Sequence, residues 1–139
     1  MNRDATIEYI LLNSKTIAVV GLSSNSRRAG YYVPAYLQEL GYRIIPVNPY
    51  LDTALGEKAY PDLNAVPEPV DLVLIFRRPD QVPAVVDKAV EIGAKAVWMQ
   101  LGIINVPAAD RAKKAGLKVV MDACIMVEHR RWQPYLSTL

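Results

Sequence analysis

The sequence predicts a doubly wound α/β fold, in which helices cover both faces of a mainly parallel β-sheet of five or six strands. Three observations predict it. Short apolar runs alternate with amphipathic helical patterns along the whole chain, as they do in βαβ units. The apolar runs are continuous rather than alternating, which is typical of strands that are buried on both faces of a sheet. Glycine follows the helical patterns at Gly41, Gly93 and Gly116, where the chain must leave each helix.

The N-terminal segment is predicted to form a short helix that leads into the first strand. Asp4 is expected to cap this helix. Residues 16–20 form a continuous apolar run that ends at Gly21, and this run is predicted to be the first strand. The buried face of the helix is expected to consist of Ile7, Ile10 and Leu11.

A polar loop follows this strand, and a second helix follows the loop. The helix is expected to begin near residues 31–33, because a proline fits only the first turn of a helix and Pro34 would otherwise lie inside it. Gly41 ends the helix, and residues 43–47 are predicted to form the second strand. The buried face of the helix is expected to consist of Val33, Leu37 and Leu40.

The second half of the chain continues the alternation after an irregular stretch that includes a short strand near residues 58–60. Asp80 is expected to cap one further helix, and residues 107–115 are predicted to form another. Three more strands are expected, at residues 71–76, 95–99 and 118–121. The inward side chains of the helix after Asp80 are expected to be Val82, Val85, Val86 and Ala89.

This alternation implies right-handed crossovers and therefore a Rossmann-like, parallel sheet. The chain of 139 residues has about the length of one domain, so we expect a single domain over residues 1–139. In sheets of this kind the ligand binds beyond the carboxyl ends of the strands, where the strand order reverses. The segments that follow the strands are therefore the candidates for a binding site.

The composition excludes several other classes of protein. Apolar residues make up 52% and charged residues 22% of the chain, as in globular proteins. The net charge of +2 gives no argument for binding to nucleic acid. No apolar run approaches the ~18 residues of a membrane span, and the N-terminus lacks the pattern of a signal peptide. We therefore expect a cytoplasmic protein that binds neither nucleic acid nor membranes.

Cysteine and histidine are too scarce for a metal centre or a disulfide framework. The chain has one Cys and one His. A disulfide within the chain needs two cysteines, and a zinc or iron centre needs more good ligands than this pair supplies. We therefore expect no metal site.

The loop after the first strand is only partly like the phosphate-binding loop of dinucleotide-binding proteins. Of the glycines in the pattern G-x-G-x-x-G, the chain keeps the first, Gly21, while Ser23 and Ser26 occupy the other two positions. Hydroxyl and amide groups of Ser24 and Asn25 add to the polar surface, and the helix beyond can hold an anion at its N-terminus. A plain connection between strand and helix remains an alternative for this loop.

A nicotinamide cofactor is disfavoured by the segment after the second strand. Such cofactors usually have an acidic residue there, which holds the ribose hydroxyls. This chain has Asn48 and Pro49 at that place.

Two arginine pairs also follow strands. Arg27 and Arg28 lie in the first loop, and Arg77 and Arg78 follow residues 71–76. The planar guanidinium group binds two phosphate oxygens at once. Each pair taken alone is equally well explained as solvated surface, but the position of both at carboxyl ends of strands favours a phosphorylated ligand.

Together these motifs resemble the small stand-alone CoA-binding proteins, which are similar to the N-terminal domain of the succinyl-CoA synthetase alpha subunit. The resemblance covers residues 15–131. The segments that carry it are 17–21 (IAVVG), 41–49 (GYRIIPVNP), 55–61 (LGEKAYP), 76–79 (FRRP), 98–102 (WMQLG), and Val120 to Asp122 with Cys124, Glu128 and His129.

The resemblance implies a cleft for coenzyme A or acyl-CoA. Its phosphates are expected near the first loop, its adenosine beside the segments that follow the second and third long strands, and its pantetheine near residues 100–102. The expected contact residues are Gly21, Ser23, Ser24, Asn25, Ser26 and Arg27; Asn48, Pro49 and Tyr50; Phe76, Arg77 and Arg78; Gln100, Leu101 and Gly102; and Cys124 as a contact for the thiol. One departure is Ala123, which stands where the family commonly has an arginine between Asp122 and Cys124.

Groups for catalysis are few. Cys124 and His129 could act as nucleophile and base, but they lie in one short segment, and a lone Cys with apolar neighbours is usually part of the core. Asp122 and Glu128 could act as a carboxylate pair. The synthetases that the chain resembles use a phosphorylated histidine on a further domain, and because this chain ends at Leu139 we expect that domain to be missing.

Three functions remain open. We favour non-catalytic binding of CoA or acyl-CoA over an NAD(P)-dependent or CoA-processing enzyme, which includes a subunit of an acyl-CoA synthetase-like complex. The third is an interaction domain that has lost its ligand. A homo-oligomer and a protein partner both stay open, and the basic, aromatic segment from Glu128 to Trp132 is expected to pack as a C-terminal cover.

Overall fold

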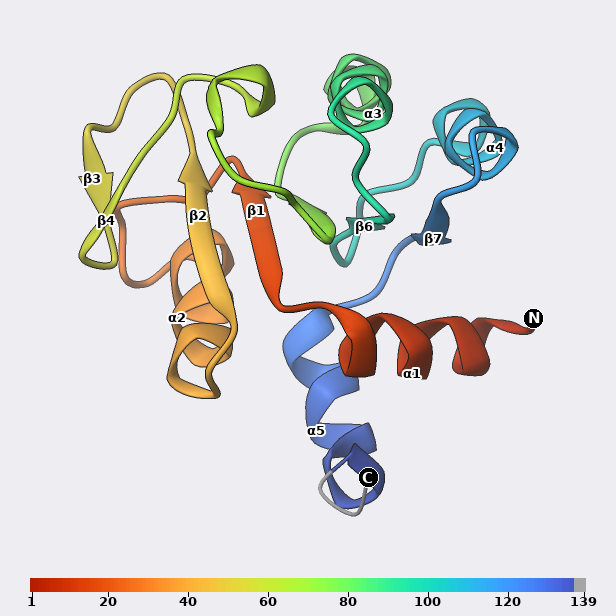
Figure 1. Cartoon of the computed structure of the whole chain (residues 1–139). Coiled ribbons are helices and arrows are strands. Elements are labelled where there is room, and N and C mark those ends of the chain that lie inside the picture. Colours follow the sequence, from red (N-terminus) through yellow and green to blue (C-terminus); the bar gives the residue numbers. More distant parts are fainter. Residues whose placement is uncertain (137–139) are drawn as a thin grey trace.

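A computed structural model describes residues 1–136 as a five-stranded parallel sheet between two layers of helices (Figure 1). The strand order is β2-β1-β5-β6-β7. These strands are β1 (Thr16–Val20), β2 (Arg43–Val47), β5 (Leu72–Ile75), β6 (Ala96–Met99) and β7 (Lys118–Val120). The predicted Rossmann-like fold is confirmed, and the boundaries of the first two strands agree with the prediction to the residue.

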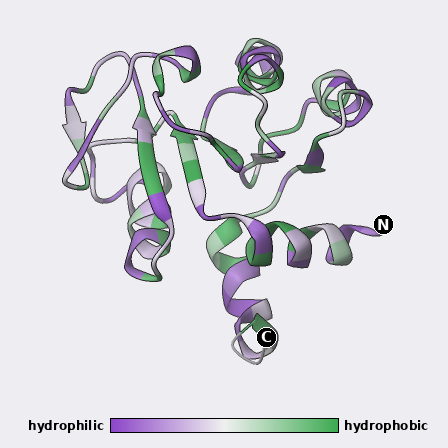
Figure 2. Ribbon diagram, in the orientation of Figure 1, coloured by the Kyte–Doolittle hydropathy of each residue, from purple (hydrophilic) through white to green (hydrophobic). Residues whose placement is uncertain are grey.

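The helices bury one apolar stripe each against the two faces of the sheet. On one face lie α3 (Val82–Glu91) and α4 (Val106–Lys114). The other face is covered by α1 (Arg3–Asn13), α2 (Ala29–Glu39) and α5 (Ile125–Leu136). Figure 2 shows β1 and β2 as mostly hydrophobic, while the helices contain both hydrophobic and hydrophilic residues. Every residue of β5 and β6 is buried, which explains why their sequences are continuous apolar runs.

A short hairpin and two 3-10 helices complete the chain. The antiparallel pair β3 (Thr53–Ala54) and β4 (Glu57–Lys58) lies beyond β2, and the 3-10 helices are η1 (Leu63–Ala65) and η2 (Pro79–Gln81). Tyr60 then forms a parallel bridge with Val47 at the end of β2. The strand predicted near residues 58–60 is thus present as a brief extension of the sheet.

The amino ends of the central strands are held by Asp71. Its carboxylate accepts hydrogen bonds from the backbone N–H groups of Lys15 (2.9 Å) and Thr16 (3.0 Å), directly before β5. Burial by itself raises the pKa of this carboxyl. The hydrogen bonds from Thr16 and Lys15, together with the charge of Lys95 at 3.7 Å, outweigh burial and leave the pKa of Asp71 below its usual value.

Two predicted helix caps are wrong. Asn2, not Asp4, caps α1, since its side-chain oxygen accepts a hydrogen bond from the N–H of Ala5 (2.8 Å). Asp4 instead forms an ion pair with Arg131, which lies far along the chain. Asp80 lies in η2 rather than at the start of α3, and its carboxylate is 3.7 Å from the guanidinium group of Arg78.

The predicted start of the second helix is also wrong, because α2 begins at Ala29 and contains Pro34. Proline has no N–H, so the carbonyl of Gly30, four residues earlier, lacks the hydrogen bond that another residue at position 34 would donate. The N–H of Ser23 donates to this carbonyl instead (3.0 Å). A hydrogen bond from the preceding loop therefore replaces the one that Pro34 removes. Leu40, predicted to be buried, is exposed at the end of the helix.

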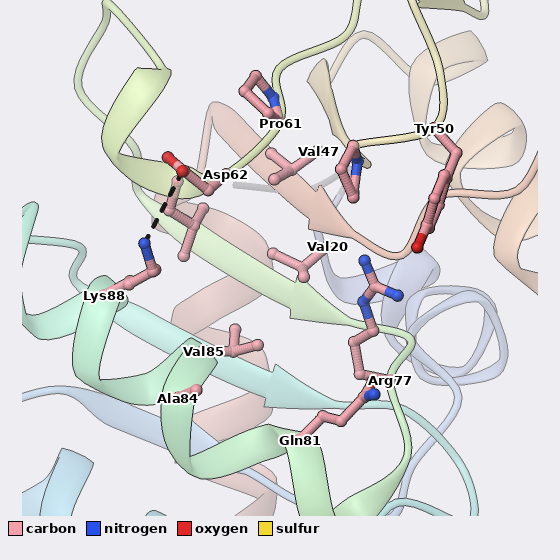
Figure 3. A pocket seen from close by; sticks show the side chains of 12 residues that line it. Val20, Val47, Tyr50, Pro61, Asp62, Arg77, Gln81, Ala84, Val85 and Lys88 are labelled. Atoms are coloured by element: carbon pink, nitrogen blue, oxygen red, sulfur yellow. Dashed lines mark ion pairs between the residues drawn. The ribbon is translucent and has the colours of Figure 1, made fainter.

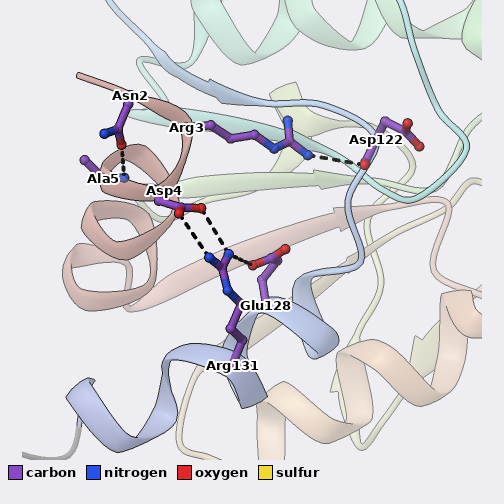
Figure 4. Close-up of polar contacts among 7 residues, drawn as sticks. All are labelled: Asn2, Arg3, Asp4, Ala5, Asp122, Glu128 and Arg131. Atoms are coloured by element: carbon purple, nitrogen blue, oxygen red, sulfur yellow. Dashed lines mark hydrogen bonds and ion pairs between the residues drawn. The ribbon is translucent and has the colours of Figure 1, made fainter.

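The C-terminal helix α5 packs against α1 and α2, as the expected cover (Figure 4). Arg131 on α5 binds both carboxylate oxygens of Asp4 at 3.0 Å. These hydrogen bonds keep the pKa of Asp4 below its usual value. Arg3 donates from the other side to the carbonyls of Met121 (2.9 Å) and Asp122 (3.3 Å). These contacts fasten α1 both to α5 and to the residues that precede it.

His129 lies on the inner side of α5. It is buried, its Nδ1 is 3.0 Å from the hydroxyl of Tyr36, and the rings of Tyr36 and Tyr42 meet it edge-on. Burial lowers the pKa of His129, because the low-polarity surroundings disfavour the charged imidazolium. Folding therefore favours the neutral ring.

The first prediction concerns acid stability. Because the folded protein binds the His129 proton less tightly than the unfolded chain, the stability from the neutral ring is complete above pH ~6.5 and is lost as the pH falls through the folded pKa. The thermal midpoint of the wild-type protein, followed by circular dichroism, should fall between pH 7.5 and 5.5. His129→Gln cannot titrate, and the chain has no other histidine, so its midpoint should change less over this window. An equal decline in both proteins contradicts the prediction.

Candidate functional site

The chain crosses over on opposite faces of the sheet after β1 and after β5. The connection from β1 to β2 uses α2, and the connection from β5 to β6 uses α3. β1 and β5 are neighbours, so the strand order reverses between them. The loops after these two strands therefore lead to opposite faces of the sheet and leave a space between them. This is the place where doubly wound sheets bind their ligands.

Gly21 makes the close packing at this point possible. Its N–H donates to the carbonyl of Val47 at 2.9 Å, and the N–H of Phe76 donates to the carbonyl of Val20 at 2.8 Å. Gly21 has φ +89°, and a Cβ atom added to it would lie 2.4 Å from the carbonyl oxygen of Phe76. Only glycine fits between the two strand ends.

The loop between β1 and α2 is held by its own polar side chains. The hydroxyl of Ser23 accepts a hydrogen bond from the N–H of Asn25, and the amide oxygen of Asn25 accepts one from the N–H of Arg27, both at 3.0 Å. From the end of β2, the Asn48 side chain donates to the carbonyl of Leu22 at 2.9 Å. Three of the predicted site residues thus shape the loop through their side chains.

The N-terminus of α2 is open. Arg28 occupies the cap position, but no side chain caps the helix. For the residues that the structure describes, no hydrogen bond is formed by the backbone N–H groups of Ser24, Ser26, Ala29 and Gly30. These groups and the positive end of the helix dipole form a site that suits an anion. A Cβ at Gly30 would lie 3.3 Å from the Gly21 carbonyl oxygen, so glycine also allows the helix to approach β1 closely.

A cavity of about 320 Å³ opens at the carboxyl ends of β1, β2 and β5 (Figure 3). Pro49, Tyr50 and Arg77 line it, so the structure brings these three predicted residues together. The serines of the first loop do not line it and lie instead at the start of α2. The complete lining is Val20, Val47, Pro49, Tyr50, Pro61, Asp62, Leu63, Arg77, Gln81, Ala84, Val85 and Lys88.

Sequence reasoning missed the wall of the cavity that follows β4. Pro61, Asp62 and Leu63 reach the site because Tyr60 pairs with Val47 and so brings the next residues to the same edge of the sheet. The strand expected near residues 58–60 was the available signal, since residues that follow a strand of this sheet are candidates. Lys88, from α3, completes the wall and lies 3.8 Å from the Asp62 carboxylate.

The two arginines after β5 differ. Arg77 is half-buried and lines the cavity, and the described part of the chain contains no acidic partner for it. Arg78 is outside the cavity lining, its side chain is 76% exposed, and Asp80 is 3.7 Å away. Figure 3 shows Arg77 and Tyr50 at one end of the cavity, while Asp62 and Lys88 lie at the other. Arg77 therefore offers the cation that a phosphate could reach.

The predicted residues after β6 have structural partners of their own. Gln100 is 4% exposed, and its side-chain oxygen accepts a hydrogen bond from the N–H of Ile125 at the start of α5 (3.1 Å). The N–H of Gly102 donates to the Asp122 carboxylate at 2.8 Å. Phe76 packs against the core cluster on the α2 side, away from the cavity lining, whereas Leu101 is exposed at the edge of the sheet.

Cys124 and His129 are not brought together as a nucleophile and base. Cys124 is half-buried at the beginning of α5, where its carbonyl accepts the hydrogen bond of the Glu128 N–H (3.0 Å). His129 faces Tyr36 instead, and among residues 1–136 no hydrogen bond joins the side chains of Cys124 and His129. Ala123 is buried, and its carbonyl accepts a hydrogen bond from the indole of Trp98 (2.8 Å).

In the part of the chain that the structure describes, neither a cluster of metal-binding side chains nor a membrane-spanning helix is present. No group of three or more His, Cys, Asp and Glu side chains lies close enough together to hold a metal ion. None of the helices is long and apolar enough to span a bilayer.

Comparison with known proteins points to one family. The sequence model described as a CoA binding domain matches residues 15–130. The Bacillus subtilis (strain 168) protein YneT is 45% identical over 125 residues, which cover 90% of this chain and 93% of YneT. A solved structure of a protein from Pyrococcus horikoshii OT3 superposes with a TM-score of 0.90 at 38% identity and covers 94% of this chain and 92% of that one.

A larger relative is an enzyme. The ADP-forming acetate–CoA ligase of Methanocaldococcus jannaschii is 27% identical over 131 residues, which cover 88% of this chain but only 18% of the ligase. The chain is therefore similar to one part of that enzyme.

The second prediction tests the packing at Gly21. Gly21→Ala should destabilise the protein by about 2–5 kcal/mol, from the positive φ (about 1–2 kcal/mol) and the collision with Phe76 (about 1–3 kcal/mol). Gly41→Ala is the matched control, because Gly41 also has positive φ (+100°) but no atom lies within 4 Å of its added Cβ. It should cost only about 1–2 kcal/mol. Urea unfolding measures both, and equal losses would show that the collision costs nothing.

Proposed function

Because the chain belongs to the CoA-binding domain family, we propose that it binds coenzyme A or an acyl-CoA at the carboxyl edge of its sheet. One observation supports this proposal most strongly. The open N-terminus of α2 and the cavity with its unpaired Arg77 lie on either side of the end of β1, where the strand order reverses. CoA carries a diphosphate, a 3′-phosphate and an adenine ring, and this arrangement offers a place for each.

The start of α2 suits the diphosphate. The free N–H groups there donate hydrogen bonds to phosphate oxygens without a side chain having to move away. Ser24 and Ser26 are exposed beside them and add hydroxyl donors. The internal hydrogen bonds of Ser23 and Asn25 hold the loop in place before a ligand arrives, which lowers the entropic cost of binding.

The cavity suits the adenosine. Apolar side chains from β1, β2, the segment after β4 and α3 make up most of its walls, and such walls favour a flat aromatic ring. Arg77 at its rim is the best placed group for the 3′-phosphate, because a guanidinium group binds two phosphate oxygens at once.

A nicotinamide cofactor fits this site less well. The residue after β2 is Asn48, whose amide donates to the Leu22 carbonyl and whose oxygen accepts from the N–H of Tyr50 (2.9 Å). The side chain is therefore occupied in holding two loops, and it supplies no carboxylate for ribose hydroxyls.

Catalysis within a larger complex is the second candidate function. The similarity to part of an acetate–CoA ligase favours it, since that relative contains additional chain. For this chain we propose that CoA binding is the basic activity, and that any acyl transfer requires groups from another protein. Assays of the purified protein for ligase, thioesterase and dehydrogenase turnover test this: activity that Cys124→Ala or His129→Ala abolishes would overturn it.

The third prediction is the ligand preference. In isothermal titration calorimetry CoA should bind with micromolar affinity or better, about −8 kcal/mol, and NAD and NADP should bind much more weakly. Mass spectrometry of the native protein should also detect co-purified CoA or acyl-CoA. The proposal fails if NAD binds more tightly than CoA, or if CoA does not bind at all.

The fourth prediction separates the two arginines. Arg77→Ala should weaken CoA binding roughly ten- to a hundredfold, since a hydrogen bond to a charged group contributes about 1.5–3 kcal/mol. Arg78→Ala is the matched control and should have little effect, because Arg78 is exposed and lies outside the cavity. The sequence had suggested that both residues contribute, and the structure leads us to expect the loss at Arg77 alone.

Dephospho-CoA identifies the phosphate that Arg77 binds. This ligand lacks the 3′-phosphate, so Arg77→Ala should change its affinity much less than that of CoA. Equal losses for both ligands would mean that Arg77 only shapes the cavity or contacts the diphosphate.

A further inference from the structure

The connection between β6 and α4 exposes three apolar side chains at the edge of the sheet where CoA is proposed to bind. Leu101 is 67% exposed and Ile104 49% exposed, and Val106, the first residue of α4, is 53% exposed. Residues 100–106 contain no charged side chain. Single exposed apolar residues are common, but this short connection exposes three, and the group is named here the 101–106 patch.

Hydrogen bonds fix this exposure. The N–H of Gly102 is bound by the Asp122 carboxylate (2.8 Å), and the side chain of Asn105 donates to the carbonyl of Pro79 (3.0 Å). Between them Ile103 packs against the core cluster under α3 and α4. With Ile103 turned inward and both ends of the loop tied down, Leu101 and Ile104 cannot also enter the core. The loop is held in a shape that presents apolar side chains to solvent.

The patch lies next to the proposed CoA site along the edge of the sheet. The cavity is at the ends of β2, β1 and β5, and β6 is the next strand in the order. Asn105 contacts Pro79, two residues after Arg77. A CoA molecule with its adenosine in the cavity has its thiol at the far end of a long pantetheine arm. That arm can continue toward β6 and bring the thiol, and whatever is attached to it, to the patch.

We propose that the 101–106 patch receives the acyl chain of an acyl-CoA, so that the protein binds thioesters of short and medium-length fatty acids more tightly than free CoA. This inference rests on the proposed function and names the ligand class of the same site. A protein partner suits the patch less well, because a stable interface involves roughly 20–30 residues on each side, whereas this patch has three apolar side chains. An acyl chain of a few carbons, by contrast, can be covered by a few apolar side chains.

The experiment compares the affinities of CoA, acetyl-CoA, butyryl-CoA and hexanoyl-CoA by calorimetry. A methylene group that is fully removed from water strengthens binding about fourfold. On an open patch we expect about twofold for each methylene, so hexanoyl-CoA, with four more methylenes than acetyl-CoA, should bind roughly tenfold or more tightly. Ile104→Ser should reduce this difference to a few-fold and leave the affinity for free CoA unchanged.

Leu40→Ser is the matched control, since Leu40 is a similarly exposed apolar residue at the end of α2, outside the cavity and the patch. It should keep the full dependence on chain length. Thermal unfolding of each variant checks that it is folded. If Ile104→Ser is unfolded, Val106→Ser takes its place in the experiment.

Three results overturn the inference in distinguishable ways. If CoA binds but affinity does not depend on acyl length, the inference fails and the proposed function stands. If no CoA species binds the wild-type protein, the proposed function fails as well. If light scattering shows that Ile104→Ser dissociates an oligomer, and the affinity for acyl-CoA does not change with acyl-chain length, the patch is a protein interface.

Discussion

The close approach of two strand ends at Gly21 is the constraint on which the rest of the site depends. β1 must end between β2 and β5, and its next residue has to turn away without touching the carbonyl of Phe76. A glycine with positive φ meets this requirement, and its N–H still completes the hydrogen bonding to β2 through Val47. The turn at Gly21 directs the polar loop toward α2 on one side of the sheet. The cavity beyond Val20 and Val47 lies on the other.

The same region couples a helix to the loop that precedes it. Pro34 removes one hydrogen bond from α2 and leaves the Gly30 carbonyl available, and the N–H of Ser23 takes it. A residue that would usually count against the helix thus helps to fix the loop at its N-terminus. Since that loop surrounds the open helix end, the rigidity of the proposed diphosphate site depends in part on a proline one turn away.

The fold could be predicted from the sequence because its strongest signals are local. After the polar first residue, Thr16 or Arg43, the runs at β1 and β2 are apolar and end at a glycine or before an asparagine, so their boundaries were predicted correctly. The caps could not be predicted in this way. Whether Asp4 caps α1 depends on Arg131, and the true start of α2 depends on a hydrogen bond from Ser23.

The residues that line the cavity also fall into two groups, those that local sequence signals predicted and those that they did not. Pro49, Tyr50 and Arg77 directly follow long strands, and the sequence indicated them. Leu63 and Lys88 reach the cavity only through the bridge at Tyr60 and the packing of α3, and neither is visible as a local pattern.

The fastening of α1 to the end of the chain has a consequence for synthesis. Arg131 and Asp4 are 127 residues apart, so α1 is synthesised long before the residue that fastens it. At roughly 5–20 residues per second, Arg131 is synthesised about 6–25 s after Asp4. During that interval the apolar stripe of α1 has no α5 to pack against, and β1 lacks β5 for much of the time. The ion pair that fastens α1 to α5 therefore forms only after Arg131 has been synthesised, however early α1 itself folds.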